Sequence, residues 1–182
     1  MFSDNTLTPR EATRLCALGT LSEGPLKYAE LAREIRAFIS YIIGPSLEVL
    51  ASSIELLKYE DLIYQSKTDG DNGEEILAIT EKGTKEFHLL LTAGLRPSDS
   101  DLNKLITALK FRFLNQLNRQ EQTEQISLLE YTFTEQLSRL SVLHSQHSKD
   151  KGSFSIWLDR EIKELEGKLL WLRKFNEELA SN

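Results

Sequence analysis

The sequence predicts a mainly α-helical protein with one small β hairpin. Apolar residues recur at helical spacing along most of the chain, and one turn-rich stretch separates two short runs of strand-forming residues. The 182 residues are 40% hydrophobic and 27% charged, which is enough apolar material for a packed core and for one or two small domains.

Three helices are expected in the first sixty residues. The first begins after Thr8, which can cap it, and Glu11 stands three residues later, as in a capping box. A second helix is expected over residues 27–38. A third is expected over residues 47–59, because its apolar residues share one helical face: Leu47, Leu50, Ile54 and Leu57.

A β hairpin and a fourth helix follow. Residues 62–65 and 76–79 are typical of strands, and the Asp-Gly and Asn-Gly pairs between them reach the positive φ of a tight turn easily. Thr80 then precedes a helix with Gly83 in its first turn. Three helices, a hairpin and a closing helix predict a winged helix-turn-helix, which we assign to residues 1–92.

The remaining residues, 93–182, are expected to form a three-helix antiparallel, coiled-coil-like dimerisation domain. The clearest apolar stripe steps by four and three residues along the last helix. So long an apolar surface predicts burial against a second copy of the chain, giving a homodimer. The residues expected to form this contact are Leu158, Ile162, Leu165, Leu169, Trp171, Leu172 and Phe175.

Composition excludes several other classes of protein. The apolar runs are all shorter than the roughly 18 residues that a membrane span needs, and the N-terminus does not resemble a secretory signal. The single cysteine, Cys16, cannot form an intramolecular disulfide and lies on an apolar helix face. We therefore expect a cytoplasmic protein with a core thiol and no contact with a membrane.

Several short motifs, in this order, resemble the PadR family of transcriptional regulators, in particular its AphA-like branch with a longer helical tail. They are LGTLSEGP at residues 18–25, Ile54 to Leu57 followed by Asp61-Leu62-Ile63, ITEKG at residues 79–83, and KLLWL at residues 168–172. The resemblance spans nearly the whole chain. It implies a homodimer that binds double-stranded operator DNA with dyad symmetry and regulates transcription, as a repressor if it occupies a promoter.

The same resemblance implies that the third helix enters a major groove. Serine can donate or accept a hydrogen bond there, and glutamate can accept one from cytosine, so the expected base contacts are Ser46, Glu48, Ser52 and Ser53. The expected phosphate contacts are Lys27, Arg33, Lys58 and Lys67, with Arg10, Arg14 and Lys82 as further candidates.

The charge distribution favours a second hypothesis. Residues 1–91 carry nine Lys and Arg against fifteen Asp and Glu, whereas residues 92–182 carry thirteen of each. The hairpin turn is also acidic, and carboxylates repel phosphates. The alternative is a degenerate winged helix that has lost DNA recognition and binds a protein partner through its acidic face.

Catalysis, cofactors and metals are not expected. The sequence contains no glycine-rich phosphate loop, no nucleophile elbow and no recognisable catalytic triad, which predicts that the protein is not an enzyme. Residues 69–80 lack the Gly and Glu that a calcium loop requires, and His144 and His147 lack further ligands nearby. A small aromatic effector bound near Trp157, Trp171 and Phe175 is an alternative to simple packing of these rings.

Overall fold

The computed structural model describes residues 6–44, 51–69, 74–148 and 152–181, and within these the side chains of residues 51–53, 67–69 and 74 are not described. The chain divides into two compact units. We call residues 5–93 and 100–117 the N-terminal unit, and residues 94–99 and 118–182 the helical-pair unit.

The N-terminal unit begins with helices α1 (Pro9–Ser22) and α2 (Tyr28–Ile43). The predicted capping box is confirmed: the Thr8 hydroxyl accepts from the Glu11 amide, and the Glu11 carboxylate accepts from the Thr8 amide. Helix α1 is almost entirely buried in its second half, so it forms the centre of this unit. Helix α2 runs five residues beyond the predicted end at residue 38 and stops at Gly44, which has a positive φ of 86°.

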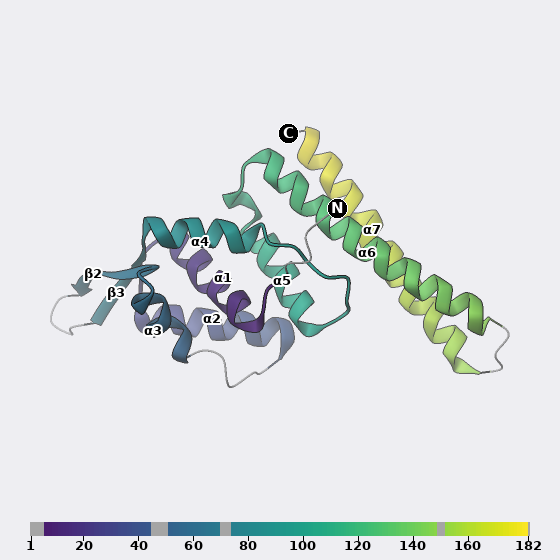
Figure 1. Ribbon diagram of the computed structural model, residues 1–182, viewed down its shortest axis with the longest axis horizontal. Coiled ribbons are helices and arrows are strands. Elements are labelled where there is room, and N and C mark those ends of the chain that lie inside the picture. The colour runs from purple at the N-terminus through teal and green to yellow at the C-terminus, as the bar shows by residue number, and fades with distance from the viewer. Residues whose placement is uncertain (1–5, 45–50, 70–73, 149–151, 182) are drawn as a thin grey trace. The chain divides into compact units, whose positions relative to one another are not determined.

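Helix α3 (Ala51–Tyr59) and the hairpin of β2 (Ile63–Asp69) and β3 (Glu74–Ile79) follow (Figure 1). The first residues predicted for α3, 47–50, lie outside the described residues. The helix ends in a Schellman motif, in which Leu62 N donates to Leu57 O and Asp61 takes the left-handed position with φ 56°. This turn directs the chain from α3 into β2.

The sheet has three antiparallel strands in the order β1-β3-β2. Strand β1 (Leu26–Lys27) was not expected from the sequence, because two residues are too short to show an alternating pattern. It pairs Leu26 with Leu77 of β3, and β2 pairs Ile63 with Ile79 before a register shift between Gln65 and Lys67. The predicted hairpin is therefore present, with one extra edge strand.

Helix α4 (Glu81–Leu91) closes the winged helix, and Thr80 caps it by accepting from the Gly83 amide at 2.9 Å. Helix α5 (Asp101–Arg112) and the 3-10 turn η2 (Leu114–Gln116) also belong to this unit. The predicted division at residue 92 placed them with the C-terminal half.

Burial explains why α5 joins the N-terminal unit. It packs against α1 and α2, and its apolar face, together with Phe113, is fully buried. The Phe113 ring meets Phe87 edge to face at 5.7 Å and lies where a side chain at Gly19 would have to be. Without α5, apolar side chains in the core of the winged helix would be exposed to water. Burying them together with the apolar face of α5 stabilises both.

The helical-pair unit consists of α6 (Arg119–His147) and α7 (Ser153–Ser181), which lie side by side along their lengths (Figure 1). Leu158, Leu165, Leu169 and Leu172 of α7 are buried, as are Ile126 and Leu129 of α6. The predicted three-helix tail is thus an antiparallel pair of long helices. None of the described helices is both long enough and apolar enough to cross a membrane.

Candidate nucleic-acid interface

The buried face of α3 positions its exposed face. Ile54 and Leu57 are 1% exposed and pack into the unit, where α3 contacts α1 and β2. Glu55, Leu56 and Tyr59 consequently face outward, with Tyr59 86% exposed. A helix held by one apolar edge beside a hairpin is the arrangement that lets a winged helix present side chains to a groove.

Most of the residues predicted to read bases fall where the structure does not describe side chains. Ser46 and Glu48 lie outside the described residues. Ser52 and Ser53 belong to the first turn of α3, and Lys67 belongs to β2, but their side chains are not described. Their contacts with DNA therefore stay predictions.

Lys58 is held by carboxylates of its own unit. Its Nζ lies 2.9 Å from Glu75 Oε2 on β3 and 3.8 Å from Glu55 Oε2 on the preceding turn of α3. The hydrogen bond to Glu75 raises the pKa of Lys58, which keeps the ammonium charged. To contact a phosphate, Lys58 must first leave Glu75.

Two further candidate cations also bind their own chain. Arg14 reaches Glu60 at 2.8 Å and Glu86 at 3.1 Å, joining α1 to the end of α3 and to α4. Lys82 donates to the backbone carbonyl of Glu60 at 2.7 Å. These contacts fix the position of α3 relative to α1 and α4, so we assign both residues a structural role.

Helix α2 presents two exposed cations, and the predicted Arg10, near the start of α1, is exposed as well. Arg33 is exposed, and Arg36 lies three residues further along, on the same side of the helix. Among the described residues neither has an ion-pair or hydrogen-bond partner. Arg36 was missed in the sequence, although its spacing from Arg33 could have indicated it.

Lys27 lies where β1 passes into α2 and is half-buried. With Tyr28, Glu55 and Glu75 it lines a shallow hollow between the start of α2, α3 and β3. Lys58 pairs with both carboxylates of the hollow, so two lysines and two glutamates meet here and their charges balance. A polyanion would therefore gain its attraction to this unit from other cations, such as Arg33 and Arg36.

The predicted dimerisation residues divide into two groups. Leu158, Leu165, Leu169 and Leu172 are covered by the same chain, because α6 packs along the apolar stripe of α7. Ile162 and Phe175 are partly exposed, and Trp171 is 52% exposed. Trp171 and Phe175, with the neighbouring 56% exposed Leu170, are therefore among the apolar side chains that α6 leaves uncovered.

The other chemically notable side chains have structural partners. Cys16 is fully buried, and burial raises the pKa of its thiol to about 12, as the expected core thiol requires. His144 pairs with Asp159 at 3.1 Å, and His147 stacks edge to face on Phe154. Within the described ranges, no group of three or more His, Cys, Asp or Glu side chains could hold a metal ion.

Fold and surface together define the class of protein: a winged helix whose third helix and hairpin face outward, followed by a pair of long helices. A sequence model of the AphA-like transcriptional regulators matches residues 2–176, and the chain belongs to this family. The resemblance seen in the sequence is confirmed. Among curated proteins, no match was found.

Solved structures of similar fold include PadR-family regulators. Bacillus subtilis PadR in complex with operator DNA is 18% identical over 93% of this chain and 99% of that chain, with a TM-score of 0.41. A PadR-like transcriptional regulator from Bacillus cereus is 17% identical over 91% and 94%, with a TM-score of 0.41. A protein from Streptococcus mutans UA159 is 22% identical over 92% and 98%, with a TM-score of 0.39.

Proposed function

We propose that the protein is a homodimeric transcriptional repressor that binds operator DNA, with α3 in a major groove and Arg33 and Arg36 on the backbone. The observation that carries this proposal is the family match over residues 2–176 on a chain with a winged helix. Repression follows if the bound dimer occupies a promoter. Catalysis has no part in this function.

The first experiment measures retention of genomic DNA fragments by the full-length protein at stepped salt concentrations. Phosphate contacts release counterions, so we expect affinity to fall as salt rises, with a log–log slope of about −0.9 for each contact. No retention at low salt, or retention that salt does not weaken, would contradict DNA binding. Transcription in vitro from a retained promoter fragment should decrease as protein is added, and an increase would contradict repression.

Substitutions test the residues. Arg33→Ala together with Arg36→Ala should weaken binding to all sequences and reduce the slope by about 0.9 for each phosphate that the variant no longer binds. Lys163→Ala together with Lys174→Ala removes the same charge from exposed sites on α7 and serves as the control. Equal effects of the two double variants would mean that net charge, and not a contact on α2, governs binding.

A second function remains open because carboxylates neutralise Lys58 and Arg14 in the N-terminal unit. If no DNA is retained, the acidic excess of residues 1–91 is better suited to a basic protein partner than to a phosphate backbone. The retention experiment separates the two functions. A DNA-binding protein should retain genomic fragments at low salt and release them as salt rises, whereas a protein that binds only a protein partner should retain none.

The homodimer is proposed from the partly exposed surface around Leu170, Trp171 and Phe175. Exposed aromatic side chains grouped on one helix are typical of contacts between subunits. Size-exclusion chromatography with light scattering should give twice the chain's 20.8 kDa at micromolar concentration. A mass of one chain would contradict the dimer.

A further inference from the structure

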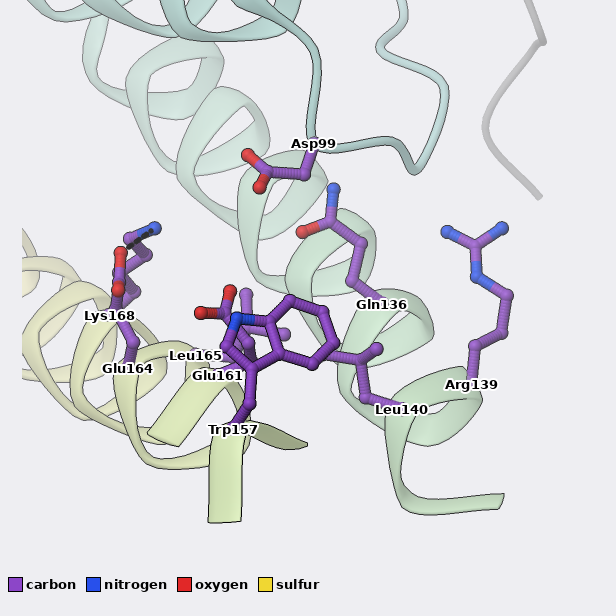
Figure 2. A pocket seen from close by; sticks show the side chains of 9 residues that line it. All are labelled: Asp99, Gln136, Arg139, Leu140, Trp157, Glu161, Glu164, Leu165 and Lys168. Carbon is purple, nitrogen blue, oxygen red and sulfur yellow. Dashed lines mark ion pairs between the residues drawn. The ribbon is translucent and has the colours of Figure 1, made fainter. Parts of the chain in front are cut away.

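Two further surfaces of the molecule could each bind a partner. One is a pocket of about 260 Å³ in the helical-pair unit, between α6, α7 and residues 94–99 (Figure 2). Acidic and basic side chains both line it, among them Glu161 and Lys168, so its charges do not select one class of ligand. The other is the outward face of α3, which contains Glu55, Leu56 and Tyr59 and whose chemistry is more selective.

The apolar part of this outward face follows from the geometry of the helix. Ile54 and Leu57 are each 1% exposed and hold α3 against the core. An α-helix turns by about 100° per residue, so Leu56 points about 200° round the helix from Ile54 and away from the core. Leu56 is 42% exposed, and Tyr59, three residues further along, is 86% exposed. These two neighbouring side chains form an apolar patch, which we call the α3 patch.

The described side chains of α3 offer no unpaired cation beside this patch. Lys58 is the one basic residue among residues 54–59, and its Nζ lies 2.9 Å from Glu75 Oε2 and 3.8 Å from Glu55 Oε2. Guanine is most often recognised by Arg or Lys side chains that donate to its O6 and N7 atoms. This part of α3 is therefore poorly suited to guanine, and base recognition here must depend on other chemistry.

Thymine supplies a group that an apolar side chain can recognise. In the major groove all four bases present hydrogen-bond donors or acceptors, whereas the C5 methyl group belongs to thymine alone. When a leucine side chain contacts this methyl group, apolar surface of both is removed from water, which favours binding. A leucine on the outward face of a helix in the groove therefore favours thymine over the other three bases.

We propose that Leu56 contacts the C5 methyl group of a thymine in each half of the operator and so sets part of the sequence preference of the protein. This inference rests on the proposed function, because Leu56 meets bases only if α3 lies in a major groove. The contact carries no charge. Unlike the backbone contacts of Arg33 and Arg36, its contribution to binding should not depend on salt concentration.

Uracil tests the contact, because it pairs as thymine does and lacks only the methyl group. Genomic fragments that the full-length protein retains are amplified with either thymidine or deoxyuridine triphosphate, and gel retardation measures the Kd of both forms. We expect the uracil form to bind roughly three- to tenfold more weakly. Both Kd values should rise with salt, while their ratio stays constant.

Substitutions connect the preference for thymine to Leu56. Leu56→Ala should bind the thymine and uracil forms with nearly equal Kd, because the shortened side chain no longer reaches the methyl group. Leu56→Met keeps an apolar side chain of similar volume and should keep most of the preference. Circular dichroism should show both variants folded, since Leu56 is partly exposed.

Leu89→Ala is the matched control. Leu89 is a 62% exposed leucine on α4 of the same unit, so its removal should leave the full preference for thymine. The inference is overturned, with DNA binding intact, if the unsubstituted protein binds both forms equally, if Leu56→Ala keeps the preference, or if Leu89→Ala loses it. Retention of no fragment at low salt would overturn the proposed function as well, and the α3 patch would then suit a protein surface.

Discussion

At the residue scale, Gly83 shows how a single position holds the winged helix together. A Cβ at this site would lie 2.0 Å from the Leu62 carbonyl oxygen and 2.8 Å from Ile79 Cγ1. The same carbonyl accepts a hydrogen bond from Thr80 N at 3.0 Å, so the start of α4 lies directly against the start of β2. Only glycine permits this approach.

Gly83→Ala should therefore lower the free energy of unfolding by roughly 1–3 kcal/mol, because backbone atoms must move apart. The helix preference of alanine over glycine, about 1 kcal/mol, acts in the opposite direction and is expected to lose. Gly167→Ala on α7 is the control, since no atom lies within 4 Å of the added Cβ, and it should stabilise the protein. Urea unfolding of both variants measures the difference, and a stabilising Gly83→Ala would contradict the close approach.

Lys110 is a second informative residue. It is 1% exposed, and its Nζ donates to the carbonyls of Leu91 at 2.7 Å and Ala93 at 2.8 Å, at the end of α4. Burial lowers the pKa of Lys110 from 10.5 to about 7. The lysine thus joins α5 to the end of α4 and explains part of the attachment of α5 to the N-terminal unit.

The lowered pKa predicts the direction of a pH effect. Between pH 7 and 10.5 the unfolded chain holds more protons on Lys110 than the folded chain, so the free energy of unfolding rises with pH in this window. Below pH 7 the cost of burying the charge is complete. Denaturant unfolding of the protein and of Lys110→Met at several pH values should show this rise only when Lys110 is present. Identical pH profiles would contradict it.

At the scale of elements, α7 has one apolar face that is buried and another that is partly exposed. Its leucine stripe is buried against α6, whereas Trp171 is half-exposed and stacks on Phe175 at 5.5 Å. A substitution in the stripe should therefore act on folding of the single chain. A substitution at Trp171 should act on association.

Leu172, which is fully buried, provides the first test: Leu172→Ala should destabilise the protein by about 2–5 kcal/mol, as large-to-small changes in a core do. Trp171→Glu should leave the circular dichroism spectrum unchanged and yield a single-chain mass in light scattering. Val142→Glu, at a similarly exposed site on α6, is the control and should remain dimeric. A dimeric Trp171→Glu would place the subunit contact elsewhere.

At the scale of the whole molecule, the net charge of −6 opposes DNA binding, and the structure locates part of this effect. The Glu75 carboxylate forms an ion pair with Lys58, a residue of α3, which is the helix expected to enter the groove. Lys58 can contact a phosphate only when its ion pair with Glu75 is broken, so the ion pair is expected to weaken DNA binding.

Glu75→Gln should release Lys58, tighten DNA binding and make the salt slope steeper by about 0.9 for each additional phosphate that the protein binds. Glu135→Gln on α6 alters the net charge equally from an exposed site in the other unit, which makes it the control. Retention of genomic fragments at stepped salt measures both. Equal changes in the two variants would indicate a general charge effect in place of a released lysine.

Local patterns predicted much of this fold. The Thr8 cap, the helix that begins after Thr80 and the hairpin all depend on residues close together in the chain, and all are confirmed. Cys16 is likewise buried, as its place on an apolar helix face indicated. The family was recognisable because several such local motifs occur in a fixed order.

The sequence by itself determined where most of the helices and the hairpin form, because capping, turn geometry and apolar periodicity act over a few neighbouring residues. Only the tertiary structure decided which surfaces are covered. It assigned α5 to the N-terminal unit, covered the α7 stripe with α6 and paired Lys58 with Glu75. An apolar stripe is the same in sequence whether it packs within one chain or between two, so burial and pairing depend on which distant residues meet.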